Sequence, residues 1–326
     1  MTWLRRRLLT ALLALPGAAA IPAWAGEDGR TYRIFMILWR GETGAEQGFR
    51  AQLHASGLKV EYIVRDADQQ AERIPAFVEE ARGLKVDLVY TWGTTVTVEV
   101  AKLLHDIPIV FTVVSWPHKA GLAGPDNLSH RNITGTSHTV PIDLQVRAIQ
   151  AYRRFERLAV VYNPIEANSI ATVQSLRDQA ERERFTLIEE AVPLDADGRP
   201  RVDDLPNLIA RVSLREPQFL FLPPDSFVGA HAEVITREAL RRHLPTFSST
   251  EPPLRDADAL FGLVAHYSAV GRLAGRKAEE VLKGRPPGEV PIERLSRFSL
   301  IVQMRVARQL GFYPPVAMFG YAEVLP

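Results

Sequence analysis

Short apolar runs alternate with amphipathic stretches from Tyr32 onward, and this alternation restricts the fold more than any other feature of the chain. The pattern is typical of βαβ units, in which helices cross over between parallel strands. We expect strands at 34–38, 60–64, 88–91, 109–113 and 133–135, and helices at 44–56, 71–82 and 95–104. Together these elements predict one doubly wound α/β lobe.

The second half of the chain repeats this architecture without repeating the sequence. Strands are expected at 158–162, 186–189, 219–222, 246–247 and 260–264, and helices at 142–153, 169–182, 202–211 and 230–242. A helix at 269–283, a strand at 298–302 and a short helix at 305–310 follow. Because 326 residues exceed the usual size of one domain, we predict an α/β fold with two doubly wound parallel-sheet lobes in tandem.

The N-terminus has the three parts of a secretory signal peptide. Three arginines, 5–7, precede an apolar run, 8–21, which is followed by the small-residue pattern Ala23-Trp24-Ala25. We therefore expect a cleavable signal peptide over 1–25 and a periplasmic protein. The apolar run has about 14 residues, fewer than the roughly 20 that span a bilayer. The arginines also suit twin-arginine export, so the choice between that route and general secretion stays open, as does the alternative of a buried helix.

The charge balance gives no sign of a polyanionic partner. Lys and Arg total 39 and Asp and Glu total 38, a formal net charge of +1, and no strongly basic stretch follows the N-terminal arginines. We therefore expect no nucleic-acid partner. The sequence has no cysteine, which excludes a disulfide scaffold, a thiolate metal site and a lipid-modified cysteine at the start of the mature chain.

The sequence contains no motif for catalysis. It has no Gly-x-Ser-x-Gly elbow, no His-Glu-x-x-His, no phosphate loop and no Gly-x-Gly-x-x-Gly fingerprint. The eight histidines are dispersed, although His118 and His266 could share a cleft. We predict that the protein is not an enzyme and that it uses no cofactor and no metal.

Residues directly after the strands are the first candidates for ligand contacts, because ligands of open parallel sheets bind beyond the carboxyl ends of the strands. In the first lobe these candidates are Trp39, Trp92, Thr94, Thr95, Ser115 and Trp116. The three tryptophans could form an aromatic wall that stacks on a flat ligand or holds a cation, or each could pack under a loop. The two threonines open a helix, where they could meet an anionic group or cap the helix.

The second half of the chain supplies mainly polar candidates at its strand ends. They are Asn163, Glu166, Asn168, Ser169, Asp225, Ser226, Ser248, His266 and Tyr267. Asp225 is the candidate to pair with a ligand ammonium, with helix capping as an equal alternative. Asn168 or Ser169 could likewise cap the helix that follows. Amide, carboxylate and hydroxyl groups therefore predict a polar half of the site, across the cleft from the aromatic half.

The segment Asn163-Pro-Ile-Glu-Ala-Asn-Ser169 resembles the ABC-transporter substrate-binding family of the type I periplasmic-binding-protein class, which includes tryptophan- and phenylalanine-binding members. The resemblance extends over nearly the whole mature chain. The other segments that carry it are Gly93-Thr94-Thr95, Ile107-Pro-Ile-Val-Phe-Thr112, Ala120-Gly121-Leu122, Asn132-Ile-Thr-Gly135, Pro224-Asp225-Ser226, Gly271 and Gly275.

This resemblance implies that the chain crosses between its lobes at three hinges. Lobe 1 would comprise 30–138 with 266–293, and lobe 2 would comprise 139–265 with 294–326. The resemblance also implies that a small molecule binds between the lobes and is delivered to an ABC permease in the inner membrane, and we expect a monomer. The groups it implies for the ligand's amino and carboxyl ends are Asn163, Glu166, Asn168, Ser169, Asp225 and the 94–95 turn.

Two departures from the family pattern imply an altered ligand. Trp116 stands where family members usually carry an acidic residue, and the loop at 39–42 is shorter than theirs. A periplasmic sensory subunit that docks on a receptor or a histidine kinase is the alternative to an importer subunit, because closure about a hinge serves both outputs.

Overall fold

The structure is a computed structural model that describes residues 30–326. The predicted signal peptide, 1–25, lies outside this range. Within the range, no helix is both long enough and apolar enough to cross a membrane. Thr31–Pro326 form one compact unit.

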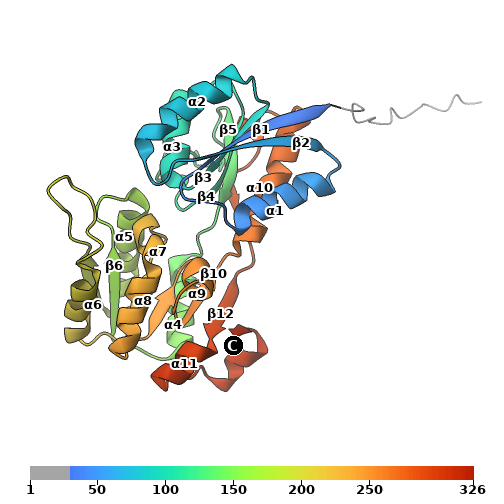
Figure 1. Cartoon of the computed structure of the whole chain (residues 1–326). Coiled ribbons are helices and arrows are strands. Elements are labelled where there is room, and N and C mark those ends of the chain that lie inside the picture. The colour runs from blue at the N-terminus through green and yellow to red at the C-terminus, as the bar shows by residue number, and fades with distance from the viewer. Residues whose placement is uncertain (1–29) are drawn as a thin grey trace, which may run out of the picture. The chain divides into compact units, whose positions relative to one another are not determined.

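The first sheet has six strands in the order β11-β5-β4-β3-β1-β2, and its pairs are parallel. Its strands are β1 (Thr31–Leu38), β2 (Lys59–Asp66), β3 (Leu88–Trp92), β4 (Ile109–Val114), β5 (Ile133–Ser137) and β11 (Glu293–Arg294). Around it lie α1 (Gly44–Ala55), α2 (Ile74–Gly83), α3 (Thr94–Leu103) and α10 (Tyr267–Leu282), with 3-10 turns η1 (Ala71–Arg73) and η2 (Pro287–Glu289) (Figure 1).

Helices cover both faces of this sheet, which explains the unbroken apolar run at 34–38 in β1. Side chains alternate along a strand, so neighbouring residues point to opposite faces. Phe35 and Ile37 pack in the core formed with α2 and α3, whereas Ile34 and Met36 pack in the core formed with α1 and α10. A strand buried on both faces needs an unbroken apolar run, which 34–38 provides.

The second sheet has seven strands in the order β13-β12-β10-β9-β8-β6-β7. Its strands are β6 (Arg157–Tyr162), β7 (Thr186–Ala191), β8 (Phe219–Leu222), β9 (Thr246–Ser248), β10 (Phe261–Val264), β12 (Ser299–Gln303) and β13 (Glu323–Leu325). One core lies between this sheet and α4 (Ile142–Tyr152), α5 (Ala167–Glu183) and α11 (Met304–Leu310), and the other lies under α6 (Leu205–Leu214) and α8 (Ala232–Arg241). One pair departs from the parallel pattern, because β12 runs antiparallel to β10.

The predicted fold class, two α/β lobes built on parallel sheets, is confirmed, and most predicted elements lie within a few residues of the observed ones. The helix expected at 230–242 corresponds to α8, and the prediction lacks the short α7 (Ser226–Ala230), which meets α8 at His231. The prediction lacks β11, β13 and α9 (Pro252–Arg255), which have two, three and four residues. Segments this short carry no periodic pattern, and β11 and β13 form only by pairing with distant strands.

The chain passes between the two sheets three times. The connections are 138–141 between β5 and α4, 265–266 between β10 and α10, and 295–298 between β11 and β12. Three crossings agree with the path implied by the family resemblance. The lobe boundaries after 138, 265 and 293 remain a proposal; the last of them falls inside β11, whose two residues both pair with β5.

Glycines allow α1 and α10 to pack with their backbones in contact. A Cβ added to Gly48 would lie 2.0 Å from the carbonyl oxygen of Ser268, and one added to Gly271 would lie 1.9 Å from that of Ala45. No side chain fits at such distances. Because α10 begins directly after the second crossing, this contact fixes the position of its first residue, Tyr267, against the first sheet.

Replacing Gly271 with alanine should therefore destabilise the protein. We expect Gly271→Ala to lower the free energy of unfolding by roughly 1–3 kcal/mol, because the helices must separate to admit a methyl group. Gly83→Ala, at the end of α2, is the matched control, since its Cβ would meet nothing within 4 Å. That control should be neutral or stabilising by up to about 1 kcal/mol. Urea denaturation measures both, and equal effects of the two substitutions would contradict the close packing.

Candidate functional site

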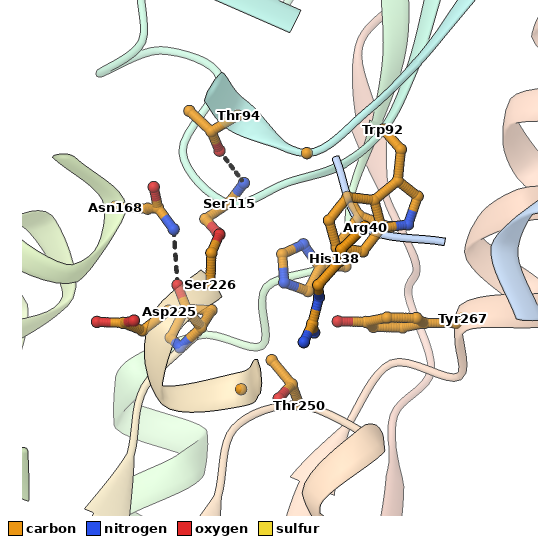
Figure 2. A pocket seen from close by; sticks show the side chains of 14 residues that line it. Arg40, Trp92, Thr94, Ser115, His138, Asn168, Asp225, Ser226, Thr250 and Tyr267 are labelled. Carbon is orange, nitrogen blue, oxygen red and sulfur yellow. Dashed lines mark hydrogen bonds between the residues drawn. The ribbon is translucent and has the colours of Figure 1, made fainter. Parts of the chain in front are cut away.

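A small pocket lies between the carboxyl ends of the two sheets (Figure 2). Residues at or directly after the ends of β1, β3, β4 and β5 line it from the first sheet, and residues after β6, β8, β9 and β10 complete it. The lining residues are Arg40, Trp92, Gly93, Thr94, Val113, Ser115, His138, Asn168, Pro224, Asp225, Ser226, Gly229, Thr250 and Tyr267. The pocket therefore occupies the place where ligands bind in open parallel sheets.

Three rings form an aromatic corner on one side of the pocket. Tyr267 meets Trp92 and His138 edge to face, with ring centres 6.5 and 5.8 Å apart. The indole Nε1 of Trp92 donates a hydrogen bond to Thr43 Oγ1 at 3.3 Å, so the polar edge of that ring is already bonded. What this corner offers a ligand is mainly apolar ring surface.

His138 adds one polar atom to the corner. The side chain is buried, and burial lowers its pKa to about 4, so the ring is neutral at pH 7. The ring hydrogen-bonds to the backbone of Val114, while its Nδ1 is buried without a partner. In a neutral imidazole the nitrogen that does not donate is an acceptor. Nδ1 can therefore accept a hydrogen bond from a ligand N–H or O–H group.

Asp225 caps α7, as the capping alternative predicted. Its Oδ1 accepts from the backbone N–H of Val228 at 2.8 Å. Its Oδ2 accepts from the backbone N–H of Asn163 at 2.7 Å and from the hydroxyl of Ser169. Burial raises the pKa of Asp225. The carboxyl group thus ties the loops after β6 and β8 together at the pocket wall.

Glu166 lies behind Asn168 and Ser226 rather than in the pocket itself. It accepts hydrogen bonds from Asn168 Nδ2 at 2.7 Å and from the backbone N–H and the hydroxyl of Ser226 at 2.9 and 3.0 Å. Burial, followed by the charge of Asp225, raises the pKa of Glu166 to about 7. Two acidic groups in one place thus create a negative potential on this wall of the pocket.

The N-terminus of α3 reaches the pocket without a side-chain cap. Gly93 is the N-cap, with a φ of 85°, and neither threonine caps the helix. Thr94 Oγ1 instead accepts from the backbone N–H of Ser115 at 3.4 Å, which joins the loops after β3 and β4. First-turn backbone N–H groups therefore remain available to an anionic ligand group beside Thr94.

The pocket brings together about half of the candidates predicted from strand ends. Those that line it are Trp92, Thr94, Ser115, Asn168, Asp225, Ser226 and Tyr267. Asn163, Glu166 and Ser169 hydrogen-bond to lining residues from behind. Thr95 is the neighbour of Thr94 but is not a lining residue. Ser248 is buried and donates to the carbonyl oxygen of Thr250, and His266 pairs with Glu251 at 2.8 Å, away from the pocket wall.

The expected wall of three tryptophans is wrong for this pocket, because only Trp92 lines it. Trp39 packs against both cores of the first lobe. Trp116 reaches across to the second lobe, where it packs on that core and its Nε1 donates to Thr172 Oγ1 at 3.2 Å. Both are large apolar rings that cover cores beside the sheet ends, which is the packing alternative stated above.

Arg40, His138 and Thr250 line the pocket but are missing from the predicted site. Arg40 belongs to the loop at 39–42, which is shorter than the corresponding loop of the family that the sequence resembles, and the sequence assigns this arginine no role. His138 directly follows β5, and the strand-end rule finds it once that strand is extended to Ser137. Thr250 lies in the polar segment after β9, next to a predicted candidate at 248.

Known proteins that resemble this chain include substrate-binding proteins. Residues 40–323 match the family described as ABC transporter substrate binding protein. A tyrosine-binding protein of Clostridioides difficile (strain R20291) is 24% identical over 263 residues, which are 79% of this chain and 74% of that relative.

Solved structures show the same fold at low sequence identity. A conserved domain protein from Vibrio cholerae matches with a TM-score of 0.83 and 21% identity, covering 91% of this chain and 100% of that one. An ABC domain from Streptococcus pneumoniae in complex with L-Trp matches with a TM-score of 0.81 and 18% identity over the same shares. The family match spans most of the chain and both lobes, so this protein belongs to the ABC transporter substrate-binding family and has a type I periplasmic-binding-protein fold.

Proposed function

We propose that this protein is the periplasmic solute-binding subunit of an ABC importer and that it binds a small amino-acid-like ligand between its two sheets. The observation that carries the proposal is the pocket itself, which draws its lining from strand ends of both sheets. The relatives support the ligand class, since one is described as tyrosine-binding and another was solved with L-Trp. The signal-peptide pattern in 1–25 supports a periplasmic location, by either export route.

The ligand would bind to complementary chemistry on the two lobes. The second lobe contributes the acidic wall at Asp225 and Glu166, which suits an ammonium group. The first lobe contributes the uncapped start of α3, which suits a carboxylate, and the aromatic corner, which suits an apolar part of the ligand. A ligand that contacts both lobes favours the state in which they are close, and that state would dock on the permease.

Ligand entry requires the pocket to widen. The pocket has a cavity volume of about 30 Å³, which leaves room for only a few water molecules. Two hydrogen bonds span the lobes nearby: Trp116 Nε1 to Thr172 Oγ1 at 3.2 Å, and Lys119 Nζ to the carbonyl oxygen of Ala171 at 3.4 Å. Separation of the lobes would break both and open the pocket, so we assign these contacts to the state that holds the ligand.

Substituting Trp92 and Trp39, two tryptophans of the first lobe, should show whether a loss of affinity is specific to the pocket. We expect Trp92→Leu to weaken ligand binding at least tenfold, because about 1.4 kcal/mol or more of ring contact is lost. Trp39→Leu is the matched control, since it removes the same ring outside the pocket and should change affinity by less than about twofold. Titration calorimetry would use an amino acid found by thermal-shift screening of the twenty standard ones. Equal losses of affinity in both variants would contradict the assignment of the pocket.

Binding of a cationic ligand group should release protons at neutral pH. Burial raises the pKa of Glu166 to about 7, so this carboxyl group changes its protonation state near neutral pH. A ligand ammonium favours the ionised carboxylate, so affinity should rise with pH between about 6 and 8. Calorimetry in phosphate and in Tris, which differ in ionisation enthalpy, measures the protons released. Glu166→Gln should bring the release close to zero, whereas proton uptake, or release that this substitution leaves unchanged, would count against the acidic wall.

The importer role has its own test. Bacterial cells that lack this chain should lose uptake of the radiolabelled ligand at micromolar concentration, and expression of the intact chain should restore it. A chain carrying Trp92→Leu should restore less uptake than one carrying Trp39→Leu. Unchanged uptake together with loss of a transcriptional response to the ligand would replace the importer with a sensory function.

A further inference from the structure

Arg40 lines the pocket, yet its charge has no partner. Its guanidinium makes no hydrogen bond or ion pair with residues 30–326, and its Nε is buried. Its Cζ lies 5.7 Å from the ring centre of Trp92, a contact that stabilises a cation less than a carboxylate does. A partly buried cation without a counter-ion costs desolvation free energy. The fold alone gives no reason to place an arginine here.

No carboxylate of the described residues forms an ion pair with Arg40, although four acidic residues line a neighbouring cavity with it: Glu42, Glu233, Glu251 and Asp256. Glu42 and Glu251 form ion pairs with other arginines at 2.5 and 2.8 Å. The charge of Arg40 affects a neighbouring histidine. The pKa of His231 is lowered mainly by burial and, after that, by the positive charge of Arg40. Arg40 thus keeps its capacity for an ion pair.

The guanidinium also stands at the junction of two cavities. A second cavity of about 490 Å³ adjoins the pocket and shares Arg40, Gly229 and Tyr267 with it. Arg40 starts in the loop after β1 and reaches α7 of the other lobe, where its Nη2 lies 3.2 Å from the place of a Cβ on Gly229. Any side chain at 229 would crowd the guanidinium. A ligand group bound here would extend toward the larger cavity and contact both lobes.

We propose that Arg40 binds an anionic group on the side chain of the ligand and thereby selects acidic compounds over neutral ones. This inference rests on the proposed function. The α-amino and α-carboxyl groups of an amino acid share one carbon, so the acidic wall and the start of α3 can hold both at once. Arg40 also lines the larger cavity, where a side chain of the ligand would extend. A carboxylate there would form a charge-assisted, two-point contact with Arg40.

The arrangement also disfavours a quaternary-amine ligand. The sequence leaves open that a tryptophan face holds a cation, but the pocket's one tryptophan already has the Arg40 guanidinium over its ring. A second cation at that place would be repelled by the first. The ligand charge expected beside Trp92 is therefore negative.

The test compares acids with their amides on the purified protein. Titration calorimetry would use L-glutamate with L-glutamine, L-aspartate with L-asparagine, and L-tyrosine and L-tryptophan as ligands with uncharged side chains. Of the two acids, the one that binds more tightly should have an affinity at least tenfold higher than that of its own amide. Arg40→Gln should reduce that ratio to about twofold or less, and Arg40→Lys should keep part of it. Arg73→Gln is the matched control, since it removes an arginine that lies over Phe77 outside the pocket and should leave the ratio unchanged.

The outcomes separate this proposal from the proposed function. Tight binding of tyrosine or tryptophan, with amides equal to acids and no effect of Arg40→Gln, would overturn the acidic-ligand proposal and leave the solute-binding function intact. Mass spectrometry of ligand released from natively purified protein is an independent test. A released compound with no anionic group beyond an α-carboxylate would also overturn the acidic-ligand proposal and leave the solute-binding function intact. Binding of no compound in the panel, and release of none, would overturn the proposed function itself.

Discussion

Parallel strand pairing is the constraint on which the rest of this structure depends. All strands of a parallel sheet end on one edge, so residues far apart in sequence meet there without any other contact. Arg40, Trp92 and His138 lie at or just after the ends of three different strands of the first sheet, and Asp225 and Thr250 follow two strands of the second. The three crossings bring these two edges to one pocket. The helices need only cover the faces, and the loops at the strand ends are free to carry chemistry.

The distribution of charge at the pocket differs between the lobes. On the second lobe, the acidic groups are held by neutral donors: Asp225 by backbone N–H groups and a hydroxyl, Glu166 by an amide and a serine. Burial raises the pKa of each carboxyl group, and the hydrogen bonds from these neutral donors lower it only in part. On the first lobe Arg40 has no carboxylate partner within the described part of the chain. Opposite charges therefore face the pocket from opposite lobes, and a zwitterionic ligand would satisfy both.

The sequence was sufficient for the architecture because each strand buried on two faces leaves an apolar run, and each covering helix leaves an amphipathic one. It was less informative about the site, for reasons visible in single residues. Trp39, Trp92 and Trp116 all lie near strand ends, and sequence position cannot tell a ring that covers a core from one that lines a pocket. Arg40 is one of many charged loop residues, and only the three-dimensional structure shows that it lines the pocket without an ion pair to any described residue. His138 depends on where β5 ends, and strand ends are the least certain part of a sequence-based prediction.

The aromatic corner is tied to helix packing as well as to strand ends. Thr43 caps α1 through a reciprocal pair of hydrogen bonds with the first turn, and the same hydroxyl accepts from Trp92 Nε1. Tyr267 is the first residue of α10, whose glycines lie against α1. Both rings are therefore held by one helix pair within the first lobe, so the corner should keep its geometry when the lobes separate. Arg40 differs, because its contact at Gly229 lies on the other lobe. Ligand capture would then combine a preformed ring surface with a charge contact that is completed only when the lobes come together.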